Sequence, residues 1–203
     1  MEQTNILRQL FPGIGFADEK LTERPLPVNA KGWFAIPKWE TVAKDYGKAL
    51  EKVLALIGKS RTLKNWREGQ LGEKYLRQLE TTEQSFVKLY EKQDSDIIII
   101  PAQFGLRHRG RSVRRAREVF ADNEFGLGSF AIGCMLLTHP EREQVWKQLH
   151  IDCAGDEYAP GGDGWFVDAP FFHWRDGGLH FSTGWTSNAG EHYGSASGFV
   201  PQK

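Results

Sequence analysis

The chain is poor in cysteine and carries no net charge. Only two of its 203 residues are cysteines, so they cannot form a disulfide framework, and a reducing compartment is the simpler interpretation. The 26 basic residues are balanced by 26 acidic ones. A neutral protein has no overall field that would attract nucleic acid or a membrane, so any such attraction has to be local.

Long apolar runs are also lacking. The longest stretch without a formally charged residue, 125–140, contains three glycines and a histidine and is shorter than the ~20 apolar residues that cross a bilayer. The N-terminal segment has an early glutamate, no basic cluster and a proline at position 12, which excludes the pattern of a secretory signal. We therefore expect a soluble, cytoplasmic protein with no membrane partner.

Common catalytic motifs are missing as well. The sequence contains no P-loop, dinucleotide fingerprint, Gly-x-Ser-x-Gly elbow, His-Glu-x-x-His or Cys-x-x-Cys. We expect no cofactor, and the sequence leaves open whether the protein is an enzyme.

A chain of 203 residues and 23.1 kDa fits one domain. Its composition changes near residue 150, because residues 150–203 hold seven acidic and two basic residues and many of the glycines. We predict an irregular arm over 1–31 and a single α+β domain over 32–203. That domain would consist of a helix-rich part, 41–149, and a glycine-rich, acidic part of strands and loops, 150–203.

Hydrophobic periodicity predicts the elements of this domain. Short apolar runs indicate strands at 32–37 and at 97–101, the second buried on both faces. Apolar residues at three- and four-residue steps predict helices over 41–58, 73–92 and within 112–149. The last region divides into a helix capped by Ser112, a buried segment over 129–137 that is either a helix or a strand, and a short helix over 140–149 that begins at a capping box. For 129–137 we favour a helix.

The clearest β signal is a C-terminal antiparallel hairpin in the sequence FHWRDGGLHFS. A turn at Gly177-Gly178 would place His173 opposite Ser182. It would also separate an apolar face from an outer face that carries His173, Arg175, His180 and Ser182. We expect this hairpin to share one mixed sheet with strands 32–37 and 97–101, and several helices to cover that sheet.

A basic segment follows the buried strand. It contains six arginines within 107–117, at the carboxyl end of a strand, where open α/β sheets tend to bind ligands. Arginine side chains suit phosphate and carboxylate oxygens, and a helix N-terminus favours anions. The segment therefore predicts an anion-binding site formed by Arg107, His108, Arg109, Arg111, Ser112, Arg114 and Arg115.

Two interpretations of this segment remain open. The arginines could pair with acidic residues of the same chain, which would leave no binding surface. Alternatively, they could engage a nucleic acid or an acidic protein surface, and this is our leading hypothesis: a non-catalytic binding protein. The oligomeric state is not indicated by the sequence.

An acidic, glycine-rich loop offers a second candidate site. Its carboxylates could supply the oxygen ligands that Ca²⁺ or Mg²⁺ prefers, although their spacing does not match an EF-hand. Asp and Gly are also common in ordinary turns. The metal-binding alternative consists of Asp152, Asp156, Glu157 and Asp163.

Residues 152–155 read Asp-Cys-Ala-Gly and resemble the Asp-Cys-Ser-Gly signature of NlpC/P60 cysteine peptidases. In that family the cysteine begins a helix, whereas Pro160 and three glycines follow here. We therefore interpret Cys153 as a small buried residue at a strand end. The alternative function is a small hydrolase whose site combines the loop acids, Cys153 and a hairpin histidine, His173 or His180.

Overall fold

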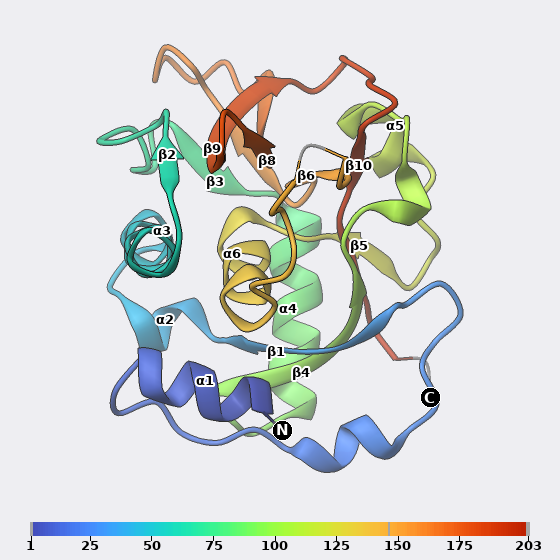
Figure 1. Ribbon diagram of the computed structural model, residues 1–203. Helices are drawn as coiled ribbons and strands as arrows, with labels where there is room; N and C mark the ends of the chain where they lie inside the picture. Colours follow the sequence, from blue (N-terminus) through green and yellow to red (C-terminus); the bar gives the residue numbers. More distant parts are fainter. Residues whose placement is uncertain (1, 146, 202–203) are drawn as a thin grey trace.

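Helix α6, Ser129–Thr138, lies at the centre of the molecule between two β-sheets (Figure 1). The computed structural model describes residues 2–145 and 147–201. Nine of the ten residues of α6 are buried, as expected for a helix that is apolar on all sides. The prediction of a buried helix over 129–137 is therefore confirmed.

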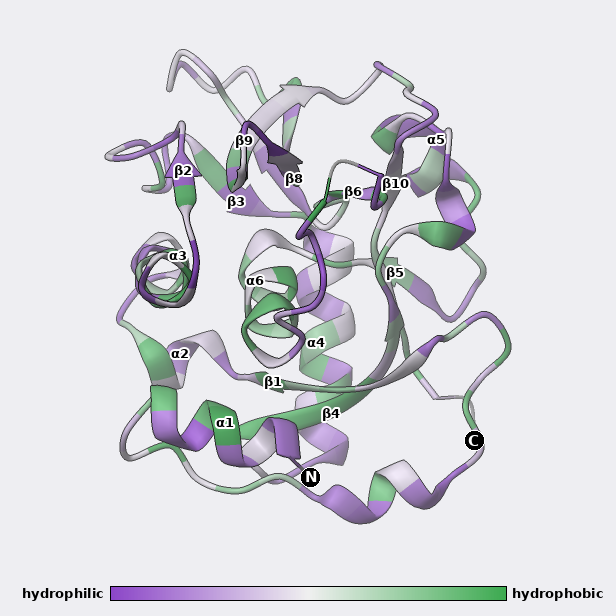
Figure 2. Ribbon diagram, in the orientation of Figure 1, coloured by the Kyte–Doolittle hydropathy of each residue, from purple (hydrophilic) through white to green (hydrophobic). Residues whose placement is uncertain are grey.

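The first sheet is antiparallel and has the strand order β1-β4-β11-β5. Its strands are β1 Gly32–Pro37, β4 Ile97–Gln103, β5 Glu124–Gly126 and β11 Ser197–Phe199. Every residue of β4 is buried, and the strand is hydrophobic along most of its length (Figure 2). Both strands predicted for this sheet are present, and the four consecutive isoleucines of β4 suit a strand with no face toward water.

The second sheet is mixed, with parallel pairs β2–β9 and β6–β10 among antiparallel ones. Its strands are β2 Leu63–Asn65, β3 Leu76–Gln78, β6 His150–Asp152, β7 Asp156–Tyr158, β8 Asp168–Arg175, β9 Gly178–Trp185 and β10 Tyr193–Ser195. The α+β class, the mixed sheet and the C-terminal antiparallel hairpin are thus confirmed. The hairpin β8–β9, however, does not join β1 and β4 in one sheet as we predicted.

Five further α-helices and two 3-10 turns cover the sheets within the described residues. They are α1 Glu2–Leu10, α2 Trp39–Val42, α3 Tyr46–Ser60, α4 Glu80–Lys92, α5 Val113–Glu118, η1 Glu19–Glu23 and η2 Leu106–His108. The arm over 1–31 contains helix α1, and its residues Leu7, Phe11 and Ile14 are buried in the main core. Across residues 2–145 and 147–201, none of the helices combines the length and apolar character that crossing a membrane requires.

Two helix predictions are wrong in part or in full. Residues 76–78 of the predicted helix 73–92 form strand β3, because they pair with β7. The predicted helix 140–149 is replaced by turns over 140–145 and 147–149, while residue 146 lies outside the described residues. Glu143 has a positive φ of 54°, which a right-handed helix does not allow. In addition, the Arg61 guanidinium donates hydrogen bonds to the carbonyl oxygens of Arg142 and Glu143, which a helix would use for its own backbone. A helix therefore cannot continue through this point.

The hairpin turn lies at Asp176-Gly177, not at Gly177-Gly178. Both residues have positive φ, 49° and 78°, as a type I′ turn requires. His173 therefore faces His180 directly instead of Ser182. Because this change moves the register by two residues, the apolar and polar faces stay as predicted.

The two sheets approach each other closely at the chain crossing between residues 126–128 and 154–155. Leu127 O accepts a hydrogen bond from Gly155 N at 2.9 Å, and Gly155 O accepts one from Leu79 N at 2.9 Å. A Cβ atom on Gly155 would lie 2.4 Å from Gly126 O and 2.6 Å from Gly128 N. Since these are backbone atoms, they cannot move away without displacing both sheets.

We predict that Gly155→Ala lowers the free energy of unfolding by about 3 kcal/mol, the upper range for overpacking a close contact. The measurement is urea unfolding followed by circular dichroism. Gly72→Ala is the matched control, because a Cβ at Gly72 meets nothing within 4 Å, and its change should stay within about 0.5 kcal/mol. Equal stability of the two variants would contradict the tight crossing.

Candidate functional site

The arginine-rich segment lies against strand β10. It leaves β4 at Gly105, whose φ of 113° and close approach to Gly194 require glycine at both positions. A Cβ on Gly105 would lie 2.4 Å from Gly194 O. Further along, Gly110 N donates to Tyr193 O at 2.9 Å. These contacts hold the segment beside the loop that joins β9 to β10.

A buried carboxylate, Glu124 on β5, anchors the segment. Its oxygens accept hydrogen bonds from Arg107 Nε at 3.0 Å, Ser197 Oγ at 2.6 Å and Ala121 N at 3.2 Å, and contact His108 Nε2 at 2.8 Å. Burial alone would raise the pKa of Glu124, but hydrogen bonds from His108, Ser197 and Ala121 outweigh it and lower the pKa to about 2. Glu124 is therefore ionised at neutral pH and balances the charge of Arg107.

His108 links the anchor to the solvent-exposed arginines. Its ring is fully buried and packs edge-on against Phe120, with centroids 5.0 Å apart. Arg111 Nη1 lies 2.9 Å from His108 Nδ1, and because a guanidinium can only donate, Nδ1 is the acceptor. Nε2 then carries the proton that His108 donates to Glu124.

Two more arginines have partners within the chain. Arg117, half-buried, donates to the carbonyl oxygens of Ala154 at 2.9 Å and Asp156 at 2.7 Å. Burial lowers the pKa of Arg117, and the carboxylates of Glu157 and Asp156 oppose that effect. Arg115 forms an exposed pair with Glu118 at 2.9 Å, an arrangement that contributes little stability.

Arg109, Arg111 and Arg114 are exposed, and none of them meets a carboxylate in the part of the chain that the structure describes. Arg109 donates one hydrogen bond to the backbone oxygen of Glu191, and Arg111 uses one N–H on His108. No hydrogen bond or ion pair reaches the guanidinium of Arg114 within residues 2–145 and 147–201. The acidic C-terminal part therefore does not neutralise these three side chains.

The N-terminus of α5 is satisfied by the protein itself. Ser112 is 8% exposed, and its hydroxyl accepts from Arg115 N at 3.2 Å, as the N-cap prediction required. Arg114 N donates to Thr186 O at 2.9 Å. An anion at this segment would thus be held by arginine side chains, while Arg107, His108 and Ser112 position them.

The four acids proposed as metal ligands have separate environments. Asp156 accepts from Tyr46 and Ser129 at the start of α6, Glu157 pairs with Arg77 at 2.8 Å, and Asp163 accepts from Trp165 N. Asp152 lines a different pocket. Within residues 2–145 and 147–201 no three His, Cys, Asp or Glu side chains are grouped as metal ligands, so we propose no metal site.

Cys153 and the hairpin histidines do not resemble a catalytic pair. The Cys153 thiol is fully buried, and burial together with Asp156 and Asp152 raises its pKa well above the usual value, the opposite of a reactive cysteine. His173 and His180 pack edge-on with ring centroids 5.2 Å apart and are 8% and 5% exposed. The polar face of the hairpin is therefore covered, partly by Trp66, which donates to His180 Nδ1 at 3.1 Å.

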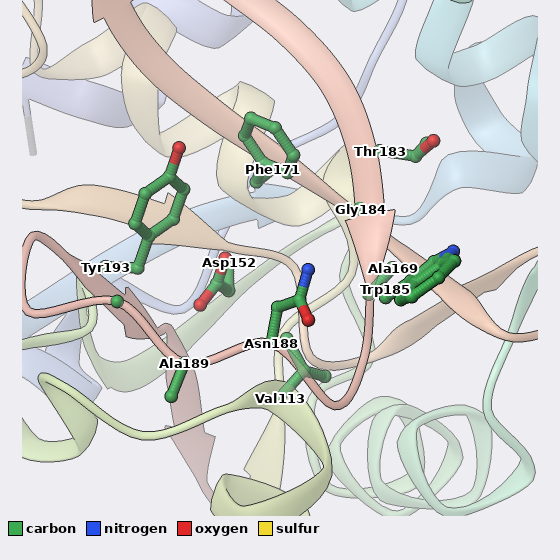
Figure 3. Close-up of a pocket in the computed structure, with 11 residues that line it drawn as sticks. Val113, Asp152, Ala169, Phe171, Thr183, Gly184, Trp185, Asn188, Ala189 and Tyr193 are labelled. Carbon is green, nitrogen blue, oxygen red and sulfur yellow. The ribbon is translucent and has the colours of Figure 1, made fainter.

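A pocket of about 310 Å³ beside the arginine segment was missed by sequence reasoning (Figure 3). It lies between the β8–β9 hairpin, the loop after β9 and the first residue of α5. Its walls include Asp152, Phe171, Trp185, Asn188 and Tyr193. The glycines that follow the hairpin in the sequence indicate a loop there. The sequence around them does not indicate that this loop contacts the arginine segment.

We predict that Glu124→Gln lowers the free energy of unfolding at pH 7 by about 3 kcal/mol, because the depressed pKa of Glu124 corresponds to stability of that size. This contribution is present above the ordinary glutamate pKa of 4.5 and is lost as the pH falls through about 2. The measurement is urea unfolding at pH 7 and near pH 2.

The stability difference between wild type and Glu124→Gln should therefore shrink strongly at the lower pH. Glu118→Gln serves as the control, since its pair with Arg115 is exposed and should contribute less than about 0.5 kcal/mol. A difference that does not change with pH would contradict an ionised anchor.

Comparison with known proteins yields no match. No protein-family model, no curated protein and no solved structure is significantly similar to the chain. The function of the arginine segment has to be inferred from its own geometry and chemistry.

Proposed function

We propose that this protein binds single-stranded nucleic acid through the arginine segment and has no catalytic role in doing so. The observation that carries the proposal is the set of three exposed guanidinium groups without a carboxylate partner among the described residues, Arg109, Arg111 and Arg114. Arg115 lies beside them, and its exposed pair with Glu118 is weak enough to be exchanged for a phosphate.

Anchored neighbours support this proposal. Since Arg107 and His108 are tied to Glu124, the backbone that carries Arg109 and Arg111 is held in place before any partner arrives. Binding then costs less conformational entropy than it would on a mobile loop. Because the chain is neutral overall, the attraction to phosphates would be short-ranged and confined to this surface.

An exposed aromatic side chain favours nucleic acid over an acidic protein surface. Trp185 ends β9 with 65% of its surface exposed, and the next residue, Thr186, accepts the backbone hydrogen bond of Arg114. Bases stack on such aromatic side chains while arginines contact the phosphates. An acidic protein surface would use the arginines but would leave the exposed indole without a matching partner.

We also infer a cytoplasmic location. Cys134 and Cys153 are both free thiols buried in the core, where burial raises the pKa of each. Thiols of this kind are typical of proteins in a reducing compartment.

The experiment is fluorescence anisotropy with a fluorescein-labelled octathymidylate over a range of salt concentrations. We predict a slope of log association constant against log salt of about −2, because each phosphate neutralised on a single strand releases about 0.7 counterions. The variant Arg109→Ala/Arg111→Ala/Arg114→Ala should bind at least about tenfold more weakly in low salt and lose most of this slope.

A variant with the same change in charge is the control. Lys20→Ala/Lys44→Ala/Lys59→Ala removes three exposed positive charges, one from η1, one from the loop before α3 and one from α3, and should bind like wild type. If both triple variants lose affinity equally, the attraction is not specific to the arginine segment and the proposal fails. Binding by wild type that is insensitive to salt would contradict it as well.

A further inference from the structure

The pocket beside the arginine segment contains a carboxylate without a partner. Asp152, the last residue of β6, is 7% exposed and lies between Tyr193 and Asn188 (Figure 3). No hydrogen bond or ion pair reaches its side chain within residues 2–145 and 147–201. Because Asp152 lines the pocket, the hydrogen-bond donors for its carboxylate have to come from water or from a ligand in that pocket.

Aromatic and small side chains surround this carboxylate. Phe171 and Tyr193 stand on one side with ring centroids 5.5 Å apart, and Trp185 lies on the other side (Figure 3). Val113, the first residue of α5, closes the pocket toward the arginine segment. The cavity of about 310 Å³ is at the small end of ligand sites, and its aromatic walls suit a flat ring.

Three other classes of ligand fit less well. A divalent cation needs several oxygen ligands, and Asp152 is the only carboxylate among the lining residues. A purely apolar ligand would leave the carboxylate buried and unpaired. A small amine would have to enter beside the arginine-bearing segment, whose positive charge opposes it.

We propose that this pocket takes one base of the bound strand and that the preferred base is guanine. Guanine presents its ring N1–H and its exocyclic amino group side by side, and an ionised carboxylate offers two acceptors side by side. At the same edge adenine presents one donor and one acceptor, cytosine presents one donor and two acceptors, and thymine has a single donor between two carbonyls. The inference rests on the proposed binding of single-stranded nucleic acid.

Hydrogen bonds connect the arginine segment to one wall of the pocket. Glu191 accepts from Arg109 and Thr186 accepts from Arg114, and both residues belong to the loop that forms one side of the pocket. A base in the pocket would therefore place its own backbone phosphates at the rim, near these arginines. Stacking on the exposed Trp185 would then hold a neighbouring base.

The protonation state of Asp152 sets the preference. Burial raises the pKa of Asp152 to about 7, and its charge acts on Tyr193 of β10 and on Cys153, the next residue along the chain. His150, two residues earlier on β6, packs against the same Tyr193 ring. Burial and the charge of Asp152 raise the pKa of Tyr193 and of Cys153, so these two groups are neutral near pH 7. Phe171, from β8, and Val113, from α5, carry no charge. Guanine preference should therefore appear above pH 7 and fade below it.

The test compares labelled octathymidylates that carry one central guanine, adenine or abasic site, by anisotropy at pH 8.5 and pH 6. At pH 8.5 we expect the guanine probe to bind wild type about tenfold more tightly than the abasic probe, as for one bidentate base contact. At pH 6 this ratio should fall toward one. Ratios of two probes remove any general effect of pH on binding to the phosphates.

Asp152→Asn should abolish the guanine preference at pH 8.5 without weakening the abasic probe. Because asparagine removes an unpaired buried charge, this variant should melt at the same or a higher temperature than wild type. Asp163→Asn, in an exposed turn of the same acidic region, is the matched control and should keep the preference.

The outcomes separate the two proposals. If wild type binds all three probes equally and with salt dependence, the base pocket is refuted while the proposed function stands. If no probe binds, both are refuted. A guanine preference that survives in Asp152→Asn would refute the role of this carboxylate.

Discussion

The arrangement of the arginine segment depends on one interaction, the buried carboxylate of Glu124 with Arg107, His108, Ser197 and the backbone of Ala121. A buried charge is tolerated only when its hydrogen bonds are satisfied, and this one has a partner at every oxygen. It joins β5, β11 and the chain after β4. The segment is thereby fixed to the first sheet while it lies on β10 of the second.

The arginines of this segment have two roles that composition does not distinguish. Arg107 donates a hydrogen bond to Glu124, and Arg117 donates to the carbonyl oxygens of Ala154 and Asp156. These two arginines therefore stabilise the junction of the sheets. Arg109, Arg111 and Arg114 point their charge to the surface without a carboxylate among the described residues. A neutral chain can in this way present a small, strongly positive surface next to a pocket.

Local patterns were sufficient to predict much of the fold. The apolar runs of β1, β4 and α6 and the cap at Ser112 were found because each is determined by neighbouring residues. Residues 76–78 and 140–149 were predicted incorrectly because distant partners override the helical pattern there, β7 in one case and Arg61 in the other.

The candidate site was predictable only in part for the same reason. The arginine-rich segment is visible in the sequence, but which arginines are free depends on Glu124, on Ala154 and on the loop after β9. The pocket is lined by residue 113, residue 152, residues 169–171 and residues 183–193, and no local pattern indicates that these segments meet. The sequence offers Asp152 only as one of four acids in a metal-binding alternative, whereas the structure places it in a pocket whose described lining residues include no second carboxylate.

NMR of the arginine Nε–Hε resonances during titration with octathymidylate tests most directly whether the exposed arginines bind the strand. We expect the resonances of Arg109, Arg111 and Arg114 to shift together, whereas those of Arg107 and Arg117 should stay in place because their partners are internal. Shifts confined to arginines outside residues 107–117, or an equal shift of Arg107 and Arg117, would contradict the proposed binding.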